Sequence, residues 1–319
     1  MRVLITEPED YSSEAVQIYQ SFGKVSFLPN LSERQLKTTE RETEILVIRL
    51  AHKIDGHWMD RFPKLKVIAT STTGLNHIDL KEAKRRKIKI ISLKGHVSFL
   101  KNITSTAEET FGLILALVRN IPAAFDHVKD GGWNRNLWKG HQLNHKTLGL
   151  LGVGRLGKIV SGYGRAFGMN VIGSDPYVDR DEMGKRRIRK VNMKLLFKEA
   201  DVLSVHIPLE TKTDKLVRAE HFALMKKSSY FINTSRGEII DELALLGALK
   251  EAKISGAALD VLTDERSNGD HLRENPLVAY AKSHHNLIIV PHMGGATYEA
   301  MEITEKYLAG LVKRHLVLY

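Results

Sequence analysis

The sequence predicts an α/β protein built on two doubly wound parallel sheets, and three observations support this fold class. The chain has 319 residues, about twice the roughly 150 residues of an average domain. Short β-branched runs alternate with helical patterns from residue 1 to about 100, and the alternation resumes after residue 146. Such alternation is typical of parallel strands whose connecting helices cover both faces of the sheet.

In the first hundred residues, five short apolar runs predict the strands of one sheet. These strands are expected at 3–5, 25–28, 45–48, 67–70 and 88–91. Helical periodicity is clear between some of them, at 12–22 and 80–86. A longer helical pattern follows at 104–119, and a polar stretch with Gly and Trp, 130–144, predicts a loop.

The second half of the chain repeats the alternation with six candidate strands. The strands are expected at 147–151, 171–174, 202–206, 230–233, 257–261 and 287–290. Helices are expected between them at 155–167, 193–199, 216–225, 241–250 and 273–282. Six strands in this rhythm are typical of a dinucleotide-binding domain. One more helical pattern, 297–316, is too short to form a domain.

Composition limits the classes of function. Apolar residues make up 43% and charged residues 27%, as in an ordinary soluble globular protein. The formal net charge of +11 invites a nucleic-acid partner. However, the basic runs 84–87 and 185–187 lack interleaved aromatic residues and belong to no known nucleic-acid-binding motif, so we expect no such partner. The charge instead suggests a positive field that draws anionic ligands.

The chain has no cysteine, which excludes disulfides, thiolate metal sites and thiol nucleophiles. Only three apolar residues lie between Arg2 and Thr6, far fewer than a signal peptide has, and the most apolar stretch, 111–118, is too short to cross a membrane. Neither the pair His141 and His145 nor the pair 284–285 has carboxylate partners at ligand spacing, so no metal is expected. We expect a cytoplasmic protein with no membrane partner.

A glycine motif marks the start of the second series of strands. Gly152, Gly154 and Gly157 form a G-x-G-x-x-G, with Arg155 and Leu156 between the last two. The motif follows an expected strand and opens an expected helix, which is the context that dinucleotide binding requires. The first glycine permits a tight turn, the second lets the backbone approach a pyrophosphate, and the third allows close packing of helix and strand. The phosphates would bind at the helix N-terminus.

Asp175 ends the next expected strand, 18 positions after Gly157. An acid near this spacing accepts hydrogen bonds from the adenosine ribose hydroxyls. Its carboxylate would repel a 2′-phosphate, and the following Pro176 and Tyr177 supply no cation to neutralise one. The sequence therefore predicts NAD rather than NADP as the cofactor.

Polar residues follow three later strands of the same domain. Arg236, Glu265 and His292 lie just beyond the expected strands 230–233, 257–261 and 287–290. The carboxyl ends of strands are where open α/β sheets build their sites. An arginine, a carboxylate and an imidazole there predict a site that binds a carboxylate and transfers a proton.

Five ordered motifs surround the glycine loop. They are 146–151, His206-Ile207-Pro208-Leu209 with Thr213, Asn233-Thr234-Ser235-Arg236-Gly237, 256–261 and Pro291-His292-Met293-Gly294-Gly295. With these motifs the sequence resembles the D-isomer-specific 2-hydroxyacid dehydrogenases over nearly its whole length. The resemblance implies an NAD-dependent, reversible hydride transfer between nicotinamide and C2 of a small anionic 2-hydroxy or 2-oxo acid, of the phosphoglycerate or the hydroxypyruvate/glyoxylate type.

The resemblance also implies roles for individual residues. Arg236, Glu265 and His292 match the catalytic triad, and Asp260 matches the acid that holds the nicotinamide carboxamide. The implied cofactor-binding residues are Gly152, Gly154, Arg155, Leu156, Gly157, Asp175, His206, Pro208, Thr213, Thr234, Ser235, Arg236, Asp260, His292, Gly294 and Gly295. The implied substrate-binding residues are Arg49, Thr73, Gly74, Leu75, Arg236 and His292.

In the implied mechanism, His292 gives a proton to the forming alkoxide or takes it back, and Glu265 favours the imidazolium. Arg236 binds carboxylate and carbonyl oxygens through its planar fork. Two positions depart from the family. The family usually has Glu-Pro where this chain has Glu265 followed by Arg266, and spacing from Asp260 favours Glu265 over the neighbouring Asp264. Arg49 is followed by Leu50 and Ala51, which weakens a phosphate pocket there.

Finally, the resemblance implies how the domains are arranged. Residues 1–100 and 297–319 would form a flavodoxin-like substrate domain, into which a Rossmann NAD-binding domain, 101–296, is inserted. The active site would lie between the two domains, where closure excludes water. A homodimer is expected through the NAD-binding domain, with the helix 107–118 and the loop of Trp133 and Trp138 as its surface. The alternative function is an NAD-sensing binding protein on the same fold.

Overall fold

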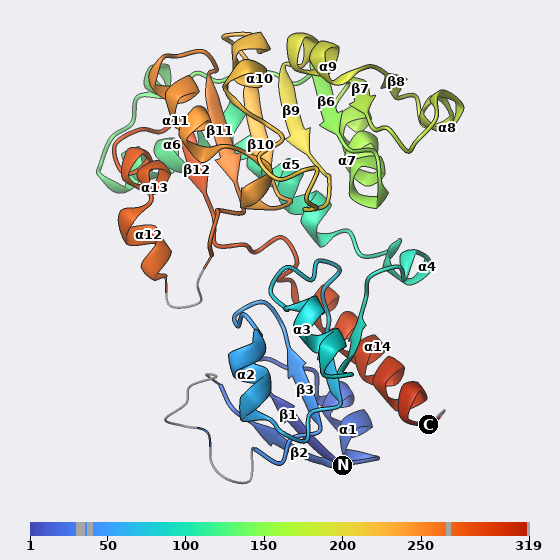
Figure 1. The fold of residues 1–319 in the computed structure, drawn as a ribbon. Coiled ribbons are helices and arrows are strands. Elements are labelled where there is room, and N and C mark those ends of the chain that lie inside the picture. The colour runs from blue at the N-terminus through green and yellow to red at the C-terminus, as the bar shows by residue number, and fades with distance from the viewer. Residues whose placement is uncertain (30–35, 37–40, 266–268, 318–319) are drawn as a thin grey trace. The chain divides into compact units, whose positions relative to one another are not determined.

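The protein is described by a computed structural model that covers residues 1–29, 36, 41–265 and 269–317. Its contacts divide the chain into two compact units, Met1–Ile103 with Ala296–Tyr319, and Thr104–Gly295 (Figure 1). The second unit is thus continuous in sequence and interrupts the first.

The first unit contains a five-stranded parallel sheet. The strands are β1 (Arg2–Ile5), β2 (Lys24–Phe27), β3 (Ile45–Ile48), β4 (Val67–Thr70) and β5 (Lys89–Ser92). Their order in the sheet is β2-β1-β3-β4-β5, and every pair is parallel. This is the flavodoxin-like order, so the fold class predicted for this region is confirmed.

Helices cover both faces of this sheet. They are α1 (Ser13–Gln20), α2 (Gly56–Arg61), α3 (Leu80–Arg85) and α14 (Tyr298–Val317), and the unit also contains the single turn α4 (Val97–Leu100). On one face α1 and α14 lie side by side and bury Tyr19, Leu308 and Val312 against the strands (Figure 1). On the other face Met59 and Phe62 anchor the end of α2. The last helix of the chain is therefore part of the first unit, because its apolar side completes the core of that sheet.

The second unit contains a seven-stranded parallel sheet. Its strands are β6 (Thr147–Leu151), β7 (Asn170–Ser174), β8 (Arg189–Lys190), β9 (Val202–Val205), β10 (Tyr230–Asn233), β11 (Gly256–Leu259) and β12 (Leu287–Ile289). The order is β12-β11-β10-β9-β6-β7-β8, which extends the Rossmann order by one strand. The strand beyond the Rossmann order is β12, at one edge. The opposite edge strand, β8, was not predicted from the sequence, because it has only two residues and carries no apolar run.

The helices of this unit form two layers. They are α5 (Ser105–Val118), α6 (Ile121–Lys129), α7 (Arg155–Ala166), α8 (Arg180–Lys185), α9 (Met193–Glu199), α10 (Ala219–Leu224), α11 (Glu242–Lys250), α12 (Asp270–Glu274) and α13 (Pro276–Ala281), with 3₁₀ turns η1 (Arg135–Trp138) and η2 (Gly237–Ile239). Apolar residues of α5 and α7 pack on one face of the sheet. Residues of α9, α10, α11 and α13 pack on the other.

The expected helices match these elements with local differences. The pattern at 273–282 contains two helices, because Asn275 caps α13 by accepting hydrogen bonds from the amides of Leu277 (2.8 Å) and Val278 (3.3 Å). Pro276 then takes the first helical position, where its missing N–H is not needed. The sequence patterns did not predict α2, α4, α6 or α8, which are short and only partly apolar.

Candidate active site

Both the glycine motif and the expected catalytic residues lie at the edge where the parallel strands of the second sheet end. We call it the carboxyl-end edge of the second unit. The strand order reverses between β6 and β9, which are neighbours in the sheet. From β6 the strands continue to one edge as β7 and β8, and from β9 they continue to the other edge as β10, β11 and β12. Open α/β sheets bind ligands at the carboxyl ends of their strands, beside such a switch point.

The glycine loop joins β6 to α7, and its backbone requires glycine. Gly152 has a φ of +97°, and a Cβ there would lie 2.6 Å from the carbonyl oxygen of His206. A Cβ on Gly157 would meet the carbonyl oxygen of Gly152. At Gly154, which caps α7, a Cβ would meet no atom within 4 Å. Two glycines are therefore needed for packing, and the third leaves open space in front of the helix N-terminus.

Asp175 follows β7 and is hydrogen-bonded to the glycine loop. Its Oδ2 accepts from the amide of Val153 at 2.9 Å, and its Oδ1 accepts from the amide of Tyr177 at 2.8 Å. The carboxylate thus holds the loop and keeps lone pairs for a further donor. Lys212, from the segment after β9, contacts the hydroxyl and the ring of Tyr177. This cation comes from another part of the chain, so the residues next to Asp175 did not predict it.

The segment after β9 contains three of the expected cofactor-binding residues. His206 lies beneath the glycine loop, and its Nε2 is 2.9 Å from the hydroxyl of Ser204. Its Nδ1 is buried without a hydrogen-bond partner among the described residues. Burial lowers the pKa of His206 to about 4, so its ring is neutral near pH 7. Thr213 donates to the carbonyl of Pro208 at 2.7 Å and so closes this loop.

The turn after β10 positions Arg236. The side chain of Asn233 donates to the carbonyl of Arg236 at 2.9 Å, and the hydroxyl of Ser235 donates to Val205 at 2.7 Å. The hydroxyl of Thr234 is 2.8 Å from that of Thr110 on α5. Burial lowers the pKa of Arg236, while nearby carboxylates, Glu265 first among them, oppose this shift. A guanidinium stays charged under such a shift, so a rigid turn holds a cation here.

His292 and Glu265 form a hydrogen-bonded pair. The Nδ1 of His292 lies 2.5 Å from Oε2 of Glu265, whose Oε1 accepts from the amide of Leu262 at 2.9 Å. Burial alone would raise the pKa of Glu265, but the hydrogen bond and charge of His292, with the Leu262 amide and Arg236, keep it below its ordinary value. Glu265 is therefore a carboxylate at neutral pH, and it binds the Nδ1 side of the imidazole.

Asp260 holds the turn that follows β12. It is 1% exposed, and it accepts hydrogen bonds from the amides of Met293 at 2.6 Å and Gly294 at 3.1 Å. The amide of His292 donates to the backbone carbonyl of Asp260 at 2.9 Å. His292 is held at a φ of +49°, a conformation uncommon outside glycine. The acid thus fixes the backbone beside the imidazole, and Gly295 adjoins open space.

Two residues at this edge were not identified from the sequence, and both come from α5. Glu109 approaches Asp260, and Thr110 contacts Thr234. Because α5 begins at the carboxyl-end edge and passes beneath the sheet, its first turns contribute polar groups there. The only available signal was two consecutive acids, Glu108 and Glu109, at the start of an otherwise apolar helix.

The expected substrate-binding residues of the first unit follow β3 and β4. All three guanidinium nitrogens of Arg49 already have partners: two bind Glu305 of α14, at 2.9 and 2.5 Å, and one binds the carbonyl of Glu9 at 3.0 Å. Arg49 thus joins the C-terminal helix to the first sheet. Thr73 is exposed, and its neighbours Gly74 and Leu75 continue a turn closed by the hydroxyl of Thr72, which donates to Gly74 at 2.7 Å. Their contact with substrate stays a prediction.

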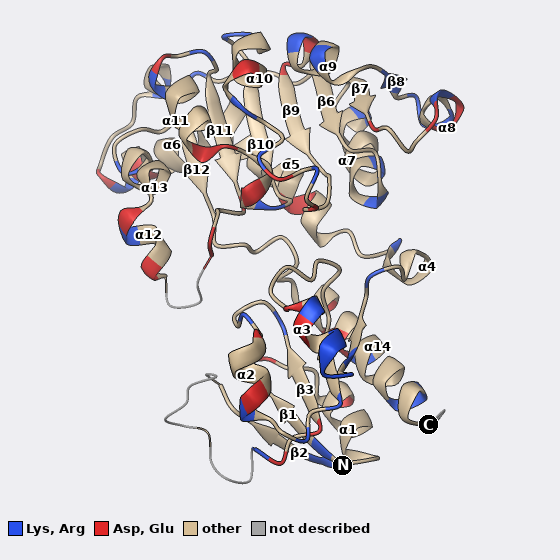
Figure 2. Ribbon diagram, in the orientation of Figure 1, with Lys and Arg blue, Asp and Glu red and all other residues tan. Residues whose placement is uncertain are grey.

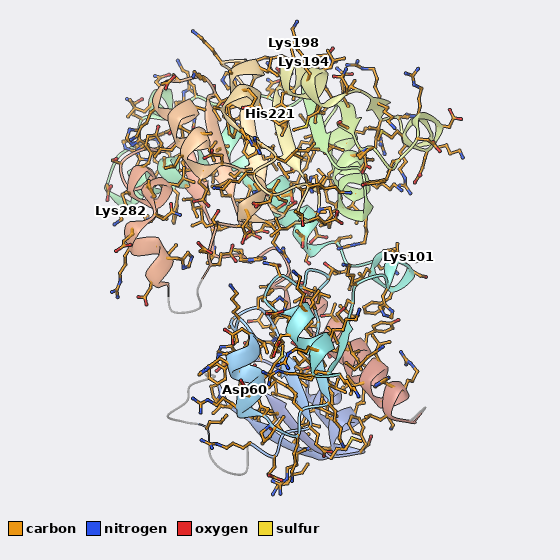
Figure 3. The ribbon with its side chains drawn as sticks, in the orientation of Figure 1. Asp60, Lys101, Lys194, Lys198, His221 and Lys282 are labelled. Atoms are coloured by element: carbon orange, nitrogen blue, oxygen red, sulfur yellow. The ribbon has the colours of Figure 1, made fainter. Side chains whose placement is uncertain are left out.

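Charged residues are spread over both units. Acidic and basic residues both appear at the carboxyl-end edge (Figure 2). Lys194 and Lys198 extend from α9 at the opposite edge of the sheet, away from the glycine loop (Figure 3). The cation Arg86 is paired with Asp60 at 2.5 Å. Basic residues therefore lie far from the candidate site as well as beside it.

Over the described ranges, no three His, Asp or Glu side chains come together as metal ligands. Within the same residues, no single helix is long and apolar enough to cross a membrane. The bent pair α5 and α6 passes this test by length and composition alone, and the apolar side of α5 is buried against the second sheet.

Residues 111–294 match the family described as "D-isomer specific 2-hydroxyacid dehydrogenase, NAD binding domain". The chain is similar to the D-3-phosphoglycerate dehydrogenase of Methanocaldococcus jannaschii, with 36% identity over 319 residues, which is 99% of this chain and 57% of the relative. It is also 36% identical to the human D-3-phosphoglycerate dehydrogenase over 271 residues, covering 85% of this chain and 48% of the relative. The chain therefore spans about half the length of the curated relatives it matches.

A solved structure shows the same fold over the whole chain. The D-lactate dehydrogenase of Aquifex aeolicus, crystallised with NAD and lactic acid, superposes with a TM-score of 0.83 at 28% identity, covering 99% of this chain and 95% of that one. The resemblance that the sequence motifs predict is thus confirmed, as is NAD as the cofactor. The chain belongs to the D-isomer-specific 2-hydroxyacid dehydrogenase family and contains its NAD-binding domain.

Proposed function

We propose that the protein is an NAD-dependent dehydrogenase that interconverts a small 2-hydroxy acid and the corresponding 2-oxo acid. The observation that carries the proposal is the His292–Glu265 hydrogen bond of 2.5 Å at the strand ends that also hold Arg236. An imidazole supported by a carboxylate is suited to general acid–base chemistry. A nearby guanidinium is suited to binding carboxylate and carbonyl oxygens.

The residues present fit NAD. Gly154 leaves open space in front of α7, whose first amides have no intrahelical acceptor, as a pyrophosphate site requires. The buried Nδ1 of His206 has no partner among the described residues and is available to a ligand. Asp175 retains acceptor capacity for ribose hydroxyls. When bound, NAD would supply the nicotinamide carbon that gives or receives a hydride.

The protein residues would then control the proton. Because Nδ1 of His292 binds Glu265, Nε2 is the nitrogen left to give a proton to the substrate oxygen during reduction and to take it back during oxidation. The carboxylate of Glu265 stabilises the charged imidazolium before that transfer. Arg236 would orient the substrate through two parallel hydrogen bonds, which a lysine cannot form.

For the substrate we propose a phosphoglycerate or a hydroxypyruvate/glyoxylate type of acid, with Asp175 favouring NAD over NADP. Relatives named D-3-phosphoglycerate dehydrogenase support the first type. The full pairing of Arg49 with Glu305 and Glu9 argues against its use in a phosphate pocket. Unphosphorylated acids are therefore the first to test.

The test is an NADH-oxidation assay with a panel of 2-oxo acids, phosphorylated and not. We expect turnover with at least one member, and repetition with NADPH measures the cofactor preference. NADH binding without oxidation of any member would contradict the proposal and favour the alternative, an NAD-sensing binding protein. A matched Asp175→Ala variant should relax the preference for NADH, since it removes the acid expected at the ribose.

We also propose that the protein is a homodimer through the NAD-binding unit. The expected surface included the helix 107–118; the apolar side of α5 is buried in the core, so only its other side is left for a partner, and its role in the dimer stays a prediction. Exposed apolar side chains instead lie on α6 and around η1, including Phe125 (63% exposed), Trp133 (90%) and Leu137 (60%). Sedimentation equilibrium of Trp133→Ser against wild type would test this: a monomeric wild type would contradict it.

A further inference from the structure

Two carboxyl groups, those of Glu109 and Asp260, meet beside the His292 turn. Glu109 comes from α5, and Asp260 follows β11. A Cβ placed on Gly294 would lie 2.5 Å from Oε2 of Glu109 and 3.0 Å from Oδ2 of Asp260. Both carboxyl groups therefore converge on one point, which only a residue without a side chain leaves open.

The hydrogen-bond donors around this pair are unequally shared. Asp260 accepts from the amides of Met293 and Gly294. Both oxygens of Glu109 are buried, and no described residue donates to them. Two ionised carboxylates can only accept hydrogen bonds and would repel each other, whereas one proton turns the contact into a hydrogen bond. Burial, and then the charge of Asp260, raise the pKa of Glu109 to about 8, so the protonated form is present at neutral pH.

We propose that Glu109 and Asp260 share a single proton, and that loss of this proton makes the site prefer oxidised over reduced nicotinamide. The proposal rests on the proposed function, because Asp260 is expected to lie at the nicotinamide. The oxidised ring carries a positive charge and the reduced ring does not. A second negative charge in the pair therefore stabilises only the oxidised form. Glu109 acts here through Asp260 and is a positioning residue.

The other charged groups around the pair define its field. His292, after β12, and Arg236, after β10, both interact electrostatically with Asp260. Glu265 is bound to His292 and partly neutralises it. Glu108, the neighbour of Glu109 on α5, is exposed and accepts a hydrogen bond from Thr104. Its charge contributes to raising the pKa of Tyr163 on α7. The pair thus lies beside the guanidinium of Arg236 and the imidazole of His292, and Asp260 is the charged group that raises the pKa of Glu109.

The experiment is calorimetric titration of the full chain with NAD⁺ and with NADH between about pH 6.5 and 9.5. Buffers of different ionisation enthalpy report the protons released on binding. Near pH 7 we expect NAD⁺ to release part of a proton and NADH to release less. The ratio of dissociation constants, NADH over NAD⁺, should rise about tenfold across this range, as expected when one charge is added near the ring.

Glu109→Gln is the diagnostic variant, because the amide imitates the protonated carboxyl. It should bind both cofactor forms, with a dissociation-constant ratio that no longer rises above pH 7. His292→Asn removes the neighbouring imidazole and should retain the rise that the carboxyl pair produces. Glu109→Met, which keeps the side-chain length, replaces the glutamine variant if that one does not fold. Glu108→Gln is the matched control on the same helix and should behave as the wild type.

The outcomes separate the two proposals. If both cofactor forms bind and Glu109→Gln keeps the wild-type pH dependence, the shared proton is overturned while the proposed function stands. If neither form binds to wild type, the proposed function fails and the cofactor preference fails with it. The shared proton then has its own readout in the cofactor-free protein: NMR of labelled glutamate should show one carboxyl that titrates near pH 8 and is absent from Glu109→Gln.

Discussion

The Glu265–His292 pair and the Glu109–Asp260 pair lie at the same carboxyl-end edge, but the pKa values of their glutamates shift in opposite directions. Burial raises the pKa of both carboxyl groups. For Glu265 the hydrogen bond and charge of His292 outweigh burial and bring the pKa below its ordinary value. For Glu109 the charge of Asp260 adds to burial, and the pKa rises to about 8. The sign of the neighbouring charge, rather than burial itself, decides which carboxyl is ionised.

This difference suggests a division of labour. An ionised Glu265 can stabilise the protonated imidazole of His292. A protonated Glu109 places no second negative charge beside Asp260. Of four substitutions, in order of decreasing effect, three remove a member of one of the pairs, and Arg236→Lys changes the cation beside both.

His292→Asn removes the proton-exchanging nitrogen and should lower kcat about 10³-fold, within the range of general acid–base catalysis. Asparagine tolerates the left-handed backbone that His292 adopts at a φ of +49°, so the turn should persist. Steady-state kinetics with NADH fluorescence titration separates catalysis from binding. His145→Asn, at an exposed residue with a φ of 63°, is the matched control. Retained kcat in His292→Asn would remove its proposed role.

Arg236→Lys tests the cation that faces both pairs. A lysine keeps the charge but loses the planar fork, so kcat/KM should fall about 10²-fold with little change in melting temperature. Steady-state kinetics and thermal unfolding measure these two quantities. Arg189→Lys, at the exposed ion pair with Glu199, should leave kcat/KM unchanged. Wild-type kcat/KM in Arg236→Lys would show that the fork has no role.

Glu265→Gln should lower kcat about tenfold, since a partly exposed pair contributes about 1 kcal/mol. The pKa of Glu265 is lower in the folded protein than in the unfolded chain. The pair with His292 therefore stabilises the fold at pH values above the unfolded pKa, and this contribution is lost as the pH falls through the folded pKa. Unfolding by denaturant at several acidic pH values should show this loss in wild type and not in the variant. Asp264→Asn, at the adjacent residue with a φ of 55°, is the control. An equal kinetic effect there would transfer the role to Asp264.

Glu109→Gln should have the smallest effect on the free energy of unfolding, on the order of 1 kcal/mol at neutral pH, because the amide replaces a carboxyl whose protonated form is present there. Folded Glu109 keeps a proton that the unfolded chain releases between about pH 4.5 and its folded value of about 8. The free energy of unfolding should therefore fall in wild type as the pH rises through this window, and fall less in the variant. Denaturant unfolding from pH 5 to 9 measures it, with Glu108→Gln as control. An equal pH dependence of the free energy of unfolding in wild type and Glu109→Gln would show that Glu109 is ionised in the folded protein throughout this pH range.

Local sequence patterns were enough to predict the framework of the protein. Strand positions such as Ile45–Ile48 and Val67–Thr70 followed from short apolar runs, since a parallel strand buried on both faces must be apolar. The glycine loop followed from backbone requirements at Gly152 and Gly157, which no other residue satisfies. These features depend on local chemistry, which neighbouring residues in the sequence express directly.

Which side chains meet across the fold depends on packing between segments that are far apart in the sequence. The pairing of His292 with Glu265 joins residues 27 positions apart, and that of Arg49 with Glu305 joins residues 256 apart. The contact of Glu109 with Asp260 depends on how α5 passes beneath the sheet. The protonation state of a side chain is set by its burial and by the sign of its nearest charged neighbour. Spacing along the chain encodes neither of these. The protonated Glu109 is therefore a property of the folded protein alone, as is the His292 contact that lowers the pKa of Glu265.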